Sequence, residues 1–197
     1  MNRHLVLLSI AQGLFLTNNV TFIAINGLVG LSLAPEGWMA TLPVMGYVVG
    51  GALSTGLVAK SQQRFGRKGS FQLGLLVAFL SAAMGAWAVL SSSFVLLVTA
   101  TVVAGYYSAN GQLYRFAAAE LCKPDYREKA VSLVMAGGLI GAIIGPNLAI
   151  QTKSLFDVPF AGAYVALMGV ALLSMGVMRF ITFPPAPVHK VDDAGGR

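Results

Sequence analysis

Six apolar windows run along the sequence, each long enough to cross a lipid bilayer as a helix. They occupy about residues 5–33, 38–59, 71–91, 93–121, 129–151 and 160–182. A helix needs about 20 mostly apolar residues to span the hydrocarbon core. Only 10% of the residues are charged, whereas soluble domains carry roughly 25%. The windows therefore predict an all-α membrane protein, with six transmembrane helices in residues 1–183 and a lipid bilayer as solvent.

The basic residues predict how these helices are oriented. If the N-terminus is cytoplasmic, eleven Lys and Arg residues fall on the inner side and only Lys153 on the outer side. Cytoplasmic loops of membrane proteins carry such an excess. The pattern predicts a protein of the plasma membrane (the inner membrane of a bacterium) with both ends in the cytoplasm and a polar cytoplasmic tail, or the start of a central loop, at 184–197. The basic residues form no continuous stripe, which excludes a nucleic-acid partner.

The first three windows resemble the last three in character. Windows one and four are rich in polar residues, and windows two and five carry glycine ladders. Many secondary transporters are built from such a 3+3 inverted repeat. The residues that carry the glycine pattern are Gly46, Gly50, Gly141, Gly145 and Pro146. They predict either fixed helix packing or smooth faces that move during transport.

Polar side chains inside the membrane windows are candidates for a substrate path. They are Asn18, Asn19, Tyr106, Asn110, Tyr114 and Arg115. A charged residue in a membrane helix normally faces a bundle interior or a cavity, so Arg115 could bind an anionic substrate or exchange charge with Glu120. The alternatives are that Arg115 reaches the membrane interface, and that Asn18 and Asn19 bond other helices through Gln72, Asn147 or Gln151.

Enzyme signatures are missing from the membrane windows. Both histidines, His4 and His189, lie outside them, and the sequence holds no Gly-x-Ser-x-Gly, no His-Glu-x-x-His and no phosphate-binding loop. We therefore expect no catalysis, no cofactor and no metal site.

Three short motifs resemble those of the major facilitator superfamily. They are Gln63-Arg64-Phe65-Gly66-Arg67-Lys68 (family pattern D-R-x-G-R-K), Arg115 to Glu120 followed by Pro124-x-x-Arg127, and Gly141-x-x-x-Gly145-Pro146. Residues 111–119 are also similar to a branch of the family that includes bacterial riboflavin and copper importers. The sequence departs from the family patterns at Ala59, Gln63, Ser132 and Ala149-Ile150, so the resemblance does not imply antiport or drug efflux.

The resemblance implies a role and a larger molecule. It implies the N-terminal half of a secondary transporter that moves a small solute by alternating access. The partner would be a second six-helix half, from the same gene, a separate chain or a second copy. The residues expected to gate the path or relay charge are Gln63, Arg64, Gly66, Arg67, Lys68, Glu120 and Arg127. The competing hypothesis is a non-transporting membrane subunit that packs against another membrane protein.

Overall fold

The computed structural model describes residues 2–184, and every regular element in that part of the chain is helical. The elements are α1 (Arg3–Leu33), η1 (Gly37–Thr41), α2 (Leu42–Leu90), α3 (Phe94–Gly111), α4 (Tyr114–Glu120), η2 (Pro124–Tyr126), α5 (Arg127–Thr152) and α6 (Ala161–Arg179). Most of the expected tail at 184–197 lies outside the described residues. Within them, five helical segments are long and apolar enough to cross a membrane.

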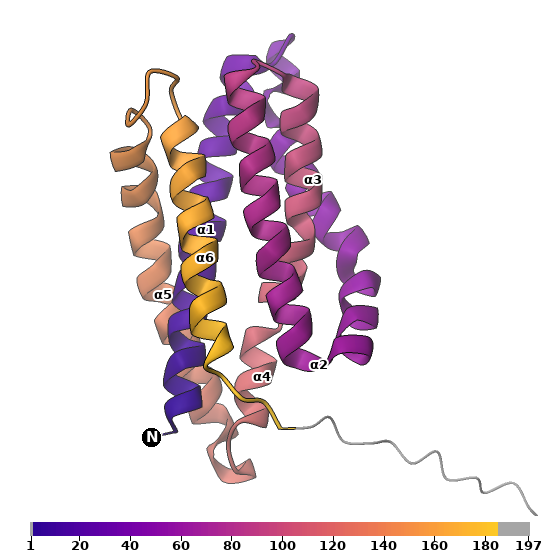
Figure 1. The fold of residues 1–197 in the computed structure, drawn as a ribbon, viewed down its shortest axis with the longest axis vertical. Helices are drawn as coiled ribbons and strands as arrows, with labels where there is room; N and C mark the ends of the chain where they lie inside the picture. The colour runs from indigo at the N-terminus through magenta and orange to yellow at the C-terminus, as the bar shows by residue number, and fades with distance from the viewer. Residues whose placement is uncertain (1, 185–197) are drawn as a thin grey trace, which may run out of the picture.

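One of these five segments is a folded-back pair. Helix α2 has 49 residues and would be about 74 Å long if it were straight, more than twice the thickness of a bilayer core. Gly66 interrupts it with φ 70° and ψ 178°, a conformation that favours glycine because it has no Cβ. The chain reverses there, and Figure 1 shows the two arms, 42–65 and 67–90, running in opposite directions from the bend.

The helices alternate in direction, so that the ends carrying positive charge gather together. The start of α1, the bend at Gly66, α4 and the end of α6 all lie at one end of the bundle (Figure 1). Asn2 Nδ2 donates to the Leu121 carbonyl at 3.0 Å, and the Thr182 amide donates to His4 Nδ1 at 3.2 Å. We call this end of the bundle the basic end.

Two glycine contacts allow neighbouring helices to approach closely. Gly141 of α5 lies against Gly13 of α1, and a Cβ on Gly141 would overlap the Gly13 carbonyl oxygen. Gly50, in the first arm of α2, lies against α3 at Val102 and Gly105 in the same way. Gly46 and Gly145 also contact facing helices. Pro146 is exposed, and α5 continues as one helix through it. The glycine ladders thus lie at helix–helix contacts.

The remaining apolar side chains divide between a core and an outer surface. Tyr114 is fully buried with its ring 4.7 Å from that of Phe71 and 5.7 Å from that of Phe15. Many large apolar side chains, including Leu53, Leu139 and Ile143, are more than half exposed. Such a surface is stable against lipid rather than water.

Candidate functional site

A cavity of about 690 Å³ opens between α1, the first arm of α2, α3 and α4. Part of its wall is aliphatic, with residues such as Ile23, Val48 and Val58. The polar side chains that line it are those of Asn19, Tyr47, Thr55, Gln62, Arg67, Ser108, Gln112 and Arg115. Apolar walls with a few polar groups are typical of a small-molecule site.

Gln62 Nε2 is buried in the cavity wall without a hydrogen-bond partner among the described residues, and the carboxamide of Asn19 also lacks one. The Asn19 side chain is 8% exposed. A buried amide without partners is costly in an apolar environment. Because Asn19 lines the cavity, a bound molecule or water can supply the missing hydrogen bonds.

Arg115 lies at the end of the cavity nearest the basic end. Its guanidinium carbon is 5.0 Å from the centre of the Phe116 ring, and the side chain is exposed. Arg115 and Glu120, which the sequence suggested could exchange charge, form no salt bridge with each other. Glu120 instead pairs with Arg67, which donates from Nη2 at 2.5 Å and from Nε at 3.1 Å. Residues five apart on a helix point in different directions, so Glu120 faces α2 while Arg115 faces the cavity.

Four of the expected path residues lie away from the cavity. Asn18 donates to the Leu167 carbonyl on α6 at 3.4 Å, and Asn110 donates to the Ser70 carbonyl in the second arm of α2 at 2.6 Å. Tyr114 is part of the aromatic core, and Tyr106 donates to Ser61 Oγ at 2.9 Å. Asn18 and Asn110 thus form interhelical bonds to backbone carbonyls. For Asn18, an interhelical bond was one of the two alternatives open from the sequence, although the expected partners were Gln72, Asn147 or Gln151.

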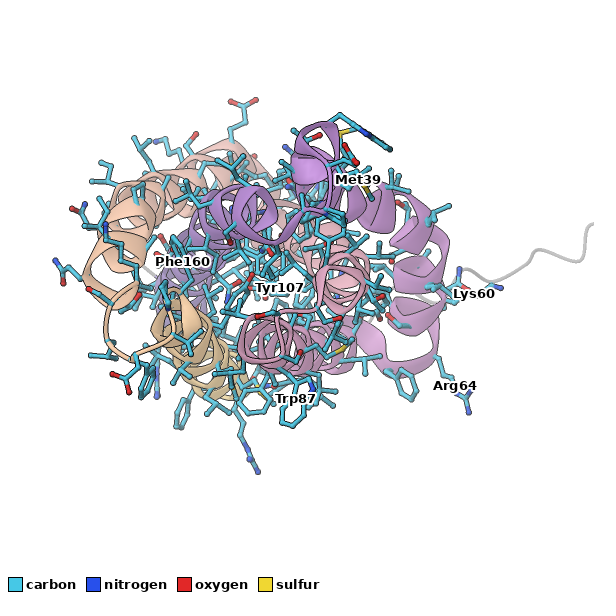
Figure 2. All side chains as sticks on the ribbon, turned by 90° about the horizontal axis from the view of Figure 1, so that it is seen from above. Met39, Lys60, Arg64, Trp87, Tyr107 and Phe160 are labelled. Atoms are coloured by element: carbon cyan, nitrogen blue, oxygen red, sulfur yellow. The ribbon has the colours of Figure 1, made fainter. Side chains whose placement is uncertain are left out.

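The sequence reasoning missed other polar residues near the cavity. Tyr47, Gln62 and Ser108 line it; Tyr47 and Ser108 do not stand out in their apolar windows, and Gln62 lies between two windows. Tyr107 is 2% exposed, and its hydroxyl has no partner among the described residues. Figure 2 shows Tyr107 at the centre of the bundle. No spacing rule separates Tyr107 from Tyr106, since only the packing decides which ring turns inward.

Comparison with known proteins identifies the family. The family model described as the Major Facilitator Superfamily matches residues 5–197. The chain belongs to the major facilitator superfamily. The expected membership is therefore confirmed, and the chain is an integral membrane protein of a transporter family rather than an enzyme.

Curated relatives from this superfamily match nearly the whole chain. The riboflavin transporter RfnT of Brucella anthropi is 36% identical over 92% of this chain and 46% of its own length. The uncharacterized transporters YddS and YdeG of Bacillus subtilis are 28% and 26% identical, each over 84% of this chain and 39% of their own length. The chain thus spans less than half the length of each of these relatives.

The loop that carries the superfamily motif lies at the basic end. Gln63 and Arg64 are exposed, Gly66 makes the bend, and Lys68 Nζ donates to the Arg179 carbonyl at 2.7 Å. Arg67 also donates to Gln62, a cavity residue. Arg127 is exposed at the start of α5. Arg67, rather than Gln63 or Arg64, is therefore the residue that links this loop to both the cavity and α4.

We predict a modest coupling between Arg67 and Glu120. The two side chains are 26% and 39% exposed, so solvent screens the pair, and about 0.5–1 kcal/mol of coupling is expected. Unfolding of Arg67→Gln, Glu120→Gln and the double variant in a detergent titration measures it. The matched cycle with Arg64→Gln should give a coupling near zero, because Arg64 forms no hydrogen bond or salt bridge with Glu120. Equal coupling in both cycles would contradict the specific pair.

Proposed function

We propose that this chain forms one six-helix half, the N-terminal one, of a transporter that moves a small organic solute by alternating access. The two arms of α2 then count as two membrane spans, and α3 with α4 counts as one. The observation that carries the proposal is the cavity, in which Asn19 lacks a partner and Arg115 is exposed, within a chain of a transporter superfamily. The second six-helix half, from the same or another chain, would supply the opposite wall.

Two sets of contacts support a 3+3 inverted repeat. The glycine contact of α1 with α5 (Gly13 and Gly141) has a counterpart in that of α3 with the first arm of α2 (Gly105 and Gly50). The amide bond from Asn18 to α6 has a counterpart in the bond from Asn110 to the second arm of α2. Equivalent residues follow one another at nearly the same spacing along the chain. An internal repeat accounts for this correspondence better than chance packing does.

The charges support an orientation with the basic end in the cytoplasm. The opposite end of the described bundle carries Glu36, Lys153 and Asp157, whereas the basic end carries most of the lysines and arginines. Cytoplasmic loops hold such an excess. The proposed location is therefore a plasma membrane, or the inner membrane of a bacterium, with the motif loop on the cytoplasmic face. There the Arg67–Glu120 pair would hold one state of the gate.

Riboflavin is the first substrate to test, because one relative is named as a riboflavin transporter. A flavin combines a flat ring with hydrogen-bonding edges and a hydroxylated side chain. The cavity offers the carboxamides of Asn19, Gln62 and Gln112 beside an aliphatic wall, with Arg115 and the Phe116 ring at one end. These groups can bond the polar edges and pack against the flat face.

Uptake in a bacterium that neither makes nor imports riboflavin tests the proposal. The chain is expressed alone and fused to the part of the Brucella relative that lies beyond the matched region. We expect the fusion to support growth and uptake of labelled riboflavin at low external concentration. A fusion that reaches the membrane but takes up no riboflavin contradicts the substrate. A fusion that also shows no flux of any solute from a small-molecule mixture contradicts the transporter role.

A further inference from the structure

A second hollow, of about 370 Å³, lies on another face of the first arm of α2. It runs between the two arms of α2 and α3, and we call it the hairpin groove. Its lining residues are Leu57, Lys60, Ser61, Arg64, Phe65, Leu73, Val77 and Tyr106. None of them lines the cavity described above, so the groove is a separate feature of the molecule.

The hairpin groove is basic at one end and apolar at the other. Lys60 and Arg64 are exposed and project from the rim of the bundle in Figure 2. Neither forms a salt bridge among the described residues. Arg64 lies 5.5 Å from the centre of the Phe65 ring. Toward the middle of the bundle, the walls are the aliphatic side chains of Leu57, Leu73 and Val77.

The floor between these two parts is polar but internally bonded. Tyr106 donates to Ser61 Oγ at 2.9 Å, and Ser61 Oγ lies 2.6 Å from Ser70 Oγ. These hydroxyls therefore need no ligand of their own. The unmatched groups of the groove are the two cations at its mouth.

The position of the groove matches the depth of one lipid leaflet. Lys60 precedes the bend at Gly66 by six residues, about 9 Å along the helix, and Leu57 precedes it by nine residues, about 14 Å. If the bend faces the cytoplasm, the cations lie near the headgroups and the aliphatic walls lie beside the acyl chains. A polar solute would leave those walls unmatched, and a protein partner would need acidic groups at headgroup depth.

We propose that the hairpin groove binds an anionic phospholipid, with its phosphate at Lys60 and Arg64 and one acyl chain along Leu57, Leu73 and Val77. Basic pockets between membrane helices on the cytoplasmic side bind anionic headgroups in this way. The lipid would lie against both arms of the hairpin and α3. The site is independent of the solute that the cavity binds.

Native mass spectrometry of the purified protein with equal amounts of phosphatidylglycerol and phosphatidylcholine tests the site. Each basic residue contributes roughly fivefold to binding of an anionic lipid surface, so Lys60→Gln with Arg64→Gln should lower phosphatidylglycerol affinity roughly 30-fold. Retention of phosphatidylcholine should not change. Val77→Trp, which fills the groove without altering charge, should also lower phosphatidylglycerol retention.

The matched control is Lys123→Gln with Lys129→Gln, which removes the same charge from exposed positions at the basic end. It should keep wild-type retention of phosphatidylglycerol. Equal loss in both pairs, or no loss in the Lys60 and Arg64 pair, overturns the proposal. Displacement of the lipid by excess inorganic phosphate also overturns it, because a site that holds the acyl chain as well as the phosphate should not release the lipid to a free anion. A mass that corresponds to a second copy of the chain, instead of a lipid adduct, overturns it too.

Discussion

Gly141→Ala should separate α1 from α5 and destabilise the bundle by about 3 kcal/mol or more. The added Cβ would overlap the Gly13 carbonyl oxygen and lie 2.6 Å from the Gly13 carbonyl carbon. Backbone atoms cannot move aside as a flexible side chain can. The separation would also weaken two hydrogen bonds across this contact, from Thr17 to the Gly141 carbonyl at 3.1 Å and from Thr21 to the Gly145 carbonyl at 2.8 Å.

Unfolding of the purified protein in a detergent titration measures this effect. Gly169→Ala is the matched control, because it changes a glycine on α6 that has nothing within 4 Å of an added Cβ. It should leave stability unchanged or raise it slightly, since alanine favours helix by about 1 kcal/mol over glycine. Gly13→Ala should be milder than Gly141→Ala, because its Cβ would lie 2.9 Å from the Gly137 carbonyl oxygen. If Gly141→Ala is as stable as Gly169→Ala, the close contact is wrong.

The glycine contacts were open to prediction because they follow from spacing alone. Glycines four apart share one helix face, and in lipid such a stripe of small residues favours close packing against another helix. The sequence did not reveal which helix each ladder meets. That depends on the order of the helices in the bundle, which places α5 against α1 and the first arm of α2 against α3.

The polar residues show where sequence reasoning stops. Asn18 and Asn19 are neighbours, and successive residues on a helix point about 100° apart. One of them therefore bonds to α6 while the other lines the cavity. Helix α1 is apolar on almost every side, so its pattern gives no direction for either asparagine.

The partner of Glu120 illustrates a second limit. Arg115 is near in sequence, but Arg67 is brought to Glu120 by the reversal at Gly66. The motif containing Gly66 predicted a loop between two helices. The pairing depends on where α4 ends relative to that loop, and α4 itself begins after a turn at Gln112 and Leu113 that the apolar window 93–121 does not show.

Arg115→Ala should reduce solute uptake by the complete transporter at least tenfold, and toward background, while the protein still inserts and folds. Arg115 lines the cavity and forms no salt bridge among the described residues, so its removal leaves no charge unpaired there. A hydrogen bond from a charged donor to a bound solute contributes about 1.5–3 kcal/mol, which corresponds to a loss of roughly 10- to 150-fold. Labelled-solute uptake, normalised to the amount of protein in the membrane, measures it.

Two variants separate a role in the cavity from a role at the membrane interface. Arg115→Lys keeps the charge and the reach to the headgroups but loses the planar set of donors, so it should retain insertion and recover only part of the uptake. Lys123→Ala removes a charge from an exposed position at the same end and should transport as the wild type does. If Arg115→Ala transports normally, or if Arg115→Lys restores uptake fully, Arg115 serves as an interface anchor rather than as a contact for the solute.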